Sequence, residues 1–129
     1  MGAYLALTLG VALLAGLCQV MVSQTVRGKL PRNELMGIRT RATKSSDAAW
    51  DAGHRAAVPA ERVTARFGLV LVVIAAVVAV IVRPGEDPGW EILVPAVGFV
   101  GTVVGLIVAG VAANRAAKGV ADGAATVAS

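Results

Sequence analysis

The residues of this 129-residue chain that could take part in recognition or catalysis gather between positions 33 and 55. Arg39 is a candidate anion-binding residue, because a guanidinium near a membrane boundary pairs with phosphate, carboxylate or helix-end carbonyl groups. Trp50 and His54 are four residues apart, which places both on one face of a helix. We interpret Trp50 as an interfacial anchor or the wall of a partner groove, and His54 as a hydrogen-bonded interfacial residue or a pH-sensitive group. The full candidate set is Asn33, Gly37, Arg39, Thr40, Thr43, Ser46, Trp50, His54 and Arg55.

These residues do not form the pattern of an enzyme or of a metal site. His54 is the only histidine, and the only cysteine, Cys18, falls within an apolar segment, so no second soft ligand lies near it. The sequence contains no nucleophile–base pair, no glycine-rich phosphate loop and no paired intramembrane carboxylates. We therefore expect no catalytic residue, no cofactor and no metal. The basic loop also lacks the aromatic stacking surface of a nucleic-acid-binding protein, so we expect no nucleic-acid partner.

Three apolar segments must position these residues. The chain is 57% hydrophobic and 16% charged, and its apolar residues are concentrated at 3–22, 63–82 and 92–113. Each segment is long enough to cross a bilayer core of about 30 Å as a helix. The first lacks a basic leader, so we expect a retained anchor rather than a cleaved signal peptide. The composition predicts an all-α membrane protein forming a single membrane domain over 1–129, with a mobile tail at 119–129.

The distribution of charge predicts the orientation of these spans. The segment 23–66 carries nine Lys or Arg residues against four acids, whereas the connection 83–91 has one arginine against three acids. Basic residues favour the cytoplasmic side of short connections. We therefore expect a multi-pass protein of the cell membrane with the N-terminus outside, and with the loop 23–62 and the C-terminus in the cytoplasm. Tyr4 and Trp90 then fall at the outer interface, where such rings are enriched.

Within the loop 23–62, the sequence predicts one short interfacial helix. Ser46 and Asp47 resemble a helix N-cap and first turn, followed by helix-compatible residues over 48–58. Pro59 should end or kink this helix, because proline removes a backbone hydrogen bond. Asp51 and Arg55 lie at the spacing of a helical ion pair.

The string from Asn33 to Arg55 resembles the SdpI family of membrane proteins, which are named for immunity to a bacterial sporulation-delaying toxin. The resemblance rests on a glycine, an apolar residue and Arg-Thr (37–40), then Thr43, Ser46, Ala-Trp (49–50) and the following His54. It is close over about 30–82 and extends to the third span by hydropathy. The chain looks like a short form that holds only the signature-bearing half of the larger immunity protein. The resemblance implies a bacterial protein of immunity or signalling, in which the signature residues bind a partner.

Small residues recur every fourth position in the third apolar segment. They leave a smooth strip along one helix face, on which another helix backbone can approach closely. This strip either packs on the other spans of the same chain, or mediates self-association or docking on a larger membrane complex. Its members are Gly101, Gly105, Ala109 and Ala113.

Two functional hypotheses follow from these patterns. In the first, the protein protects against or senses a membrane-active peptide toxin, and its basic loop contacts anionic lipids or a soluble regulator. In the second, the protein is an accessory structural subunit that docks onto a larger membrane or cell-envelope complex, with a homo-oligomer as a further possibility. Both describe a protein that is not an enzyme.

Overall fold

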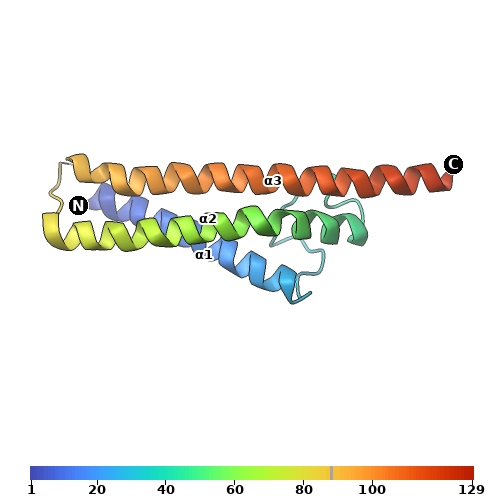
Figure 1. The fold of residues 1–129 in the computed structure, drawn as a ribbon, viewed down its shortest axis with the longest axis horizontal. Coiled ribbons are helices and arrows are strands. Elements are labelled where there is room, and N and C mark those ends of the chain that lie inside the picture. The colour runs from blue at the N-terminus through green and yellow to red at the C-terminus, as the bar shows by residue number, and fades with distance from the viewer. Residues whose placement is uncertain (88) are drawn as a thin grey trace.

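Three long helices and one short 3₁₀ turn make up the described chain: α1 (Gly2–Val26), α2 (Asp47–Val82), η1 (Trp90–Ile92) and α3 (Leu93–Ala128). The computed structural model describes residues 1–87 and 89–129. Residue 88, within the predicted connection 83–91, lies outside the described residues. The end of α1, the start of α2 and the end of α3 all lie at one end of the molecule (Figure 1). We call this end, which also holds residues 27–46, the charged end.

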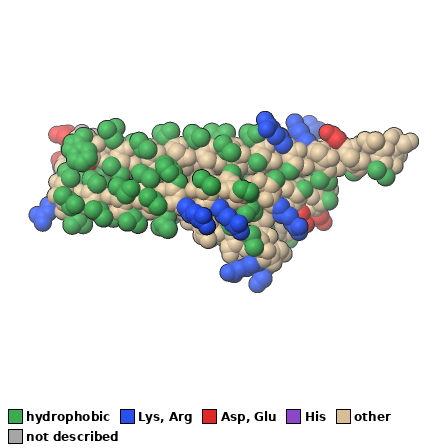
Figure 2. Space-filling model, in the orientation of Figure 1, with side chains coloured by type: hydrophobic (Ala, Val, Ile, Leu, Met, Phe, Trp, Pro, Cys, Tyr) green, Lys and Arg blue, Asp and Glu red, His purple; other side chains and the backbone are tan. Residues whose placement is uncertain are grey.

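All three helices are long and apolar enough to cross a membrane, which confirms the predicted all-α membrane fold. Their outer surfaces carry large apolar side chains, among them Leu13, Val80 and Ile81, of which about three quarters is exposed (74%, 75% and 75%). Figure 2 shows this apolar cover around the half of the molecule away from the charged end. A soluble monomer rarely exposes such a continuous apolar surface, whereas lipid tails solvate it well.

Two of the helices are longer than a bilayer requires. α2 and α3 each contain 36 residues, or about 54 Å of helix, against the roughly 30 Å of a hydrocarbon core. The unbroken apolar part of α2 occupies 67–82 and that of α3 occupies 92–113. The polar parts, 47–66 and 114–128, therefore extend past the apolar layer at the charged end.

The predicted short interfacial helix at 48–58 is wrong as a separate element. α2 runs without a break from Asp47 through Pro59 to Val82. Proline in a helix interior removes the hydrogen bond to the carbonyl four residues earlier, here that of Arg55. Both Pro59 and Arg55 are exposed, so water can solvate the freed carbonyl. Tertiary packing on either side of Pro59 offsets the remaining cost, because Ala57 is fully buried against α3 and Glu61 is 3% exposed.

The end of the chain is also more regular than its composition suggests. The segment predicted as a mobile tail, 119–129, continues α3 as a helix up to Ala128. Almost every residue beyond position 121 is exposed, and Figure 1 shows the last turns of α3 extending beyond the start of α2.

The strip of small residues lies in the interface between α3 and α2. Ala109 and Ala113 form a buried cluster with Ala57 of α2. Gly101 faces the ring of Phe67, and Gly105 faces Thr64 so closely that a side chain there would meet the threonine hydroxyl. The two backbones therefore approach at the glycines and the alanines fill the remaining space, as in close helix packing within membranes.

α1 packs against both other helices in the apolar layer and then diverges from them. Near the start of the apolar part of α2, a Cβ atom added to Gly68 would lie 2.7 Å from the Ala15 side chain of α1 and 3.4 Å from Thr102 of α3. Tyr4 is only 3% exposed and donates a 2.6 Å hydrogen bond to the Ala75 carbonyl. Its ring therefore lies inside the bundle, whereas Trp90 is 65% exposed. Towards the charged end, Figure 1 shows α1 leaning away from α2.

We predict that Gly105→Ala lowers the thermal stability of the protein in detergent. The added methyl group would collide with Thr64, whose hydroxyl is fixed by a 2.8 Å hydrogen bond to the Ala60 carbonyl. Overpacking of this kind costs about 1–3 kcal/mol, which exceeds the gain of about 1 kcal/mol in helix propensity.

Gly110→Ala is the matched control, because no atom lies within 4 Å of a Cβ atom at that position. It should leave the melting temperature unchanged or raise it. An equal response of the two variants, measured by circular dichroism during heating, would show that the α2–α3 interface does not have this geometry.

Candidate functional site

The side chain of His54 links the start of α2 to the loop before it. His54 is 2% exposed. Its Nε2 accepts a 2.8 Å hydrogen bond from the backbone N–H of Ile38, and its Nδ1 lies 2.8 Å from the carbonyl oxygen of Trp50. A backbone N–H can only donate and a carbonyl can only accept, so this arrangement requires a neutral imidazole with its proton on Nδ1. Both ring nitrogens are therefore occupied by the backbone.

Trp50 lies under the loop rather than at a surface. Its side chain is 1% exposed and forms a buried cluster with Met21 of α1 and Leu30. The indole N–H donates a 2.9 Å hydrogen bond to the Leu30 carbonyl, and the ring lies 4.2 Å from that of His54. The interpretation of Trp50 as an anchor in the bilayer interface is therefore wrong. The ring instead ties the end of α1, the loop and α2 together.

Gly37 allows the loop to approach these two rings. Its backbone has φ of +116°, a conformation that L side chains rarely adopt. A Cβ atom there would lie 2.6 Å from Nε2 of His54 and 2.8 Å from the Trp50 ring. Glycine is therefore required twice at this position, for the backbone angle and for the space that brings the Ile38 N–H to His54.

Three hydroxyl groups complete the fold of this loop. Thr43 is fully buried, and its hydroxyl donates a 2.7 Å hydrogen bond to the Ile38 carbonyl while accepting one of 2.9 Å from the Thr40 N–H. The Thr40 hydroxyl accepts in turn from the Thr43 N–H at 3.1 Å. Ser46 caps α2, because its hydroxyl accepts from the Ala49 N–H at 3.0 Å.

The remaining candidate residues lie at the surface. The side chain of Asn33 accepts hydrogen bonds from the N–H groups of Leu35 and Met36 (2.8 and 2.7 Å), which fixes a turn. Arg39 forms an exposed 2.6 Å ion pair with Glu34. Arg55 is exposed, and the described residues give it no ion pair, including the one expected with Asp51. The signature thus separates into a buried part, which holds the loop in place, and two exposed cations.

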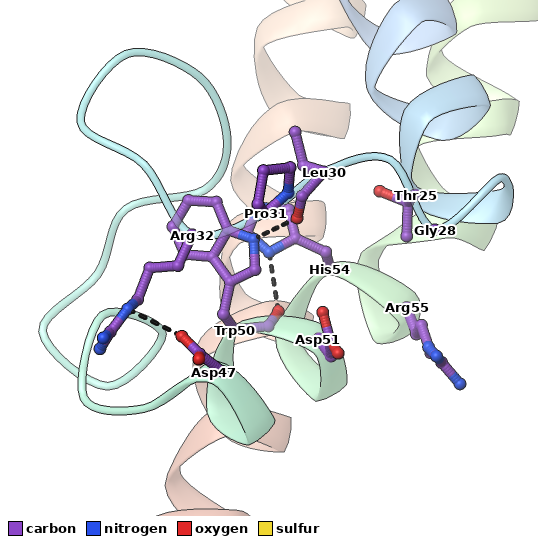
Figure 3. A pocket seen from close by; sticks show the side chains of 10 residues that line it. All are labelled: Thr25, Gly28, Leu30, Pro31, Arg32, Asp47, Trp50, Asp51, His54 and Arg55. Atoms are coloured by element: carbon purple, nitrogen blue, oxygen red, sulfur yellow. Dashed lines mark hydrogen bonds and ion pairs between the residues drawn. The ribbon is translucent and has the colours of Figure 1, made fainter.

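A pocket of about 480 Å³ opens between the end of α1, residues 28–32 and the first turns of α2. Figure 3 shows the Trp50–Leu30 hydrogen bond at its centre and the ion pair of Arg32 with Asp47 (3.1 Å) at one side. Asp51 and Arg55 complete the charged lining. The pocket therefore presents both signs of charge to a group that enters it.

Sequence reasoning missed one buried acid. Glu61 is only 3% exposed, and its Oε2 atom has no hydrogen-bond partner among residues 1–87 and 89–129. In the charge count that predicts the orientation, Glu61 is one of the four acids of the segment 23–66. Its position four residues from both Ala57 and Ala65, which are buried, was the available signal that it shares their face of α2. A carboxyl group in such a place lowers stability when it is ionised.

The described part of the chain contains no cluster of three or more His, Cys, Asp or Glu residues that could hold a metal ion. The polar side chains of the loop are instead engaged in its own hydrogen bonds. The site is therefore a folded polar module at the end of a helical membrane bundle.

These features define a multi-pass membrane protein with a folded loop between its first and second membrane helices. The model of the SdpI/YfhL protein family matches residues 29–111, and the chain therefore belongs to this family. The predicted resemblance is confirmed, and the match continues through the apolar part of α3, which the sequence analysis related to the family by hydropathy alone. No curated protein and no solved structure shows significant similarity to the chain.

We predict that Gly37→Ala disrupts the loop, whereas Gly28→Ala has a smaller effect. Both glycines have positive φ, but only Gly37 has neighbours within 4 Å of a Cβ atom. The unfavourable positive φ alone costs an alanine about 1 kcal/mol. With the added contacts, we expect Gly37→Ala to lower the free energy of unfolding by roughly 2 kcal/mol or more. Denaturant unfolding followed by Trp50 fluorescence in a Trp90→Phe background measures both. Equal losses would contradict the contact between Gly37 and the two rings.

We predict that the loop loses stability as the pH falls below about 6.5, the ordinary pKa of histidine. Burial lowers the pKa of His54, an effect opposed by its hydrogen bond to Trp50 and by Asp51. Between the lowered pKa and 6.5 the unfolded loop binds more protons than the folded one, so stability rises with pH there and is complete above 6.5.

The same fluorescence measurement at several pH values tests this expectation. His54→Asn should lower stability at all pH values and remove the rise of stability with pH near pH 6, leaving the opposite slope of Glu61, whose pKa burial raises to about 7. A slope of unchanged size in His54→Asn would assign the pH dependence to other groups.

Proposed function

We propose that the protein is a non-enzymatic component of the bacterial cell membrane that protects against, or senses, a membrane-active peptide, with its charged end facing the cytoplasm. Membership of the SdpI/YfhL family over 29–111 supports this proposal, because that range includes the signature residues, all of α2 and most of the apolar part of α3. The excess of nine Lys or Arg residues over four acids in 23–66 supports the orientation.

The observation that carries the proposal is that some signature residues hold the loop in shape, whereas others are exposed cations. Gly37 and the buried residues Thr43 and His54 fix the shape of the loop, and that shape presents Arg39 at the surface, while Arg55 is exposed on α2. A rigid scaffold with exposed cations is suited to recognition, because less conformational entropy is lost on binding. Arg39 can exchange its exposed pairing with Glu34 for a partner carboxylate at little cost, since exposed ion pairs contribute at most about 1 kcal/mol.

A second candidate function is that of an accessory subunit in a larger membrane complex. The projecting end of α3 favours it, because residues beyond 121 form an exposed helix that the chain itself leaves without a packing partner among its described residues. In this case the protein should co-purify with a partner in fixed ratio, and its deletion should leave resistance to peptides unchanged.

We predict that cells lacking the protein become more sensitive to a membrane-active peptide, and that Arg39→Ala fails to restore protection while wild type does. Arg39 is exposed, and among residues 1–87 and 89–129 its side chain bonds only to Glu34, so its loss should leave the fold and the amount of protein in the membrane unchanged. Arg41→Ala is the matched control, since Arg41 is a neighbouring exposed arginine outside the signature. The minimum inhibitory concentration of the peptide, with quantitative blotting of membranes, provides the readout.

Full protection by Arg39→Ala at normal protein levels would contradict the role of Arg39 in recognition. Unchanged sensitivity of the deletion strain to membrane-active peptides, together with a stoichiometric partner, would favour the accessory function.

A further inference from the structure

A groove runs between α1 and α2 on the face where the two helices diverge. It consists of two adjoining hollows, one of about 320 Å³ near the charged end and one of about 260 Å³ deeper in the apolar layer. Both are lined by Gln19 and Arg66, so they form one continuous groove. Small residues of α1, among them Ala12 and Gly16, leave the deeper hollow open.

The hollow near the charged end is basic. Arg27 at the end of α1 and Arg62 and Arg66 of α2 line it, and no acidic side chain does. Arg62 and Arg66 are one helical turn apart on the same face. All three arginines are exposed, and in the described structure none of them forms an ion pair. Glu61, the adjacent acid, points into the bundle and is 3% exposed.

The deeper hollow is apolar and lies at membrane depth. Apart from Gln19 and Arg66 its lining consists of Ala, Gly, Leu and Val side chains, including Leu69 and Val72. From Arg66 to Val72 the groove extends over six residues of α2, or about 9 Å. Figure 2 shows Lys and Arg side chains beside the place where the broad apolar surface ends, on the face where α1 leans away from α2.

The basic hollow and the apolar hollow follow one another along the groove, as the charged headgroup and the acyl chains do in a phospholipid. Arg66 directly precedes the unbroken apolar part of α2, 67–82, and its exposed side chain is long enough to reach from there towards the depth of lipid phosphates. Arginine binds phosphate through paired hydrogen bonds, and basic pockets between membrane helices accept anionic headgroups. The apolar hollow then lies where the acyl chains of the same lipid begin.

We propose that the groove between α1 and α2 is a binding site for an anionic glycerophospholipid. Its phosphate pairs with Arg66, Arg62 and Arg27, and one acyl chain lies along Gly16 and Leu69. The absence of an acid from the lining favours an anionic headgroup over a zwitterionic one. The lipid also fills the space that opens where α1 diverges, and so holds α1 against α2 at this level. The groove is lined by none of the signature residues between 33 and 55, so this site does not rest on the proposed function.

Native mass spectrometry of the full chain in detergent tests the proposal, with phosphatidylglycerol and phosphatidylcholine of identical acyl chains as probes. Wild type should retain phosphatidylglycerol with at least tenfold preference, since each arginine near the surface contributes roughly a fivefold factor. The variant Arg27→Gln, Arg62→Gln, Arg66→Gln should lose most of that preference. Equal retention of the two lipids by wild type would overturn the proposal.

The variant Lys29→Gln, Arg41→Gln, Lys44→Gln is the control for net charge. It removes the same number of exposed positive charges, all of them outside the groove. Its preference for phosphatidylglycerol should stay within about threefold of that of wild type, because charges far from the groove act on the lipid only through screened long-range attraction. Equal losses in the two triple variants would show a general charge effect and no site. Unchanged Trp50 fluorescence in both variants confirms that the loop remains folded.

Gly16→Leu tests the acyl part of the site. No atom lies within 4 Å of a Cβ atom at Gly16, so the larger side chain fills the hollow without disturbing the helix. It should weaken phosphatidylglycerol binding by at least threefold, whereas Gly110→Leu, at an equally open position outside the groove, should not. Displacement of the lipid by millimolar inorganic phosphate, or wild-type affinity in Gly16→Leu, would reduce the site to one for a phosphate ion and contradict the proposal.

Discussion

The neutral imidazole of His54 is the contact on which the charged end depends. A loop that folds back on a helix must satisfy its own backbone groups, because a buried N–H or C=O without a partner costs free energy. Here the His54 ring satisfies one of them, the Ile38 N–H, and is itself held in place by the Trp50 carbonyl of α2. This arrangement requires glycine at position 37 for clearance. The spacing of the glycine, tryptophan and histidine in the sequence therefore follows from the close packing of Gly37 on the rings of Trp50 and His54.

The long helices give this loop its place relative to the membrane. The apolar halves of α2 and α3 are solvated by lipid, and their polar halves continue beyond the apolar layer without a break. The polar half of α2 is held by the end of the apolar part of α3, because Ala57 of α2 is buried against Ala109 and Ala113 of α3. α1 stops earlier and leans away, which opens both the pocket beneath the loop and the groove along α2. The loop module is thus held on two helix extensions rather than on the bilayer surface.

The spans and the family were predictable from the sequence because they depend on local properties. An uncharged segment long enough to cross lipid identifies a membrane helix whatever it packs against, and the order of signature residues is itself a linear pattern. The features that were missed depend on partners distant in the sequence. Pro59 remains inside a helix because α3 packs beside it, and Glu61 is buried because it shares the face of Ala57. Trp50 points inward because α1 ends beside it with Met21. The element that covers each of these residues, α3 for α2 and α1 for Trp50, lies elsewhere in the sequence.

The protonation state of His54 offers the most direct test of this arrangement. The chain contains a single histidine, so two-bond ¹H–¹⁵N correlation spectra of ¹⁵N-histidine-labelled protein in detergent micelles report on this ring alone. At pH 7.5 the spectrum should show one neutral form with its proton on Nδ1, and slow exchange of that proton. A proton on Nε2, or a mixture of the two tautomers as in free imidazole, would contradict the hydrogen bonds to Ile38 and Trp50 and with them the fold of the loop.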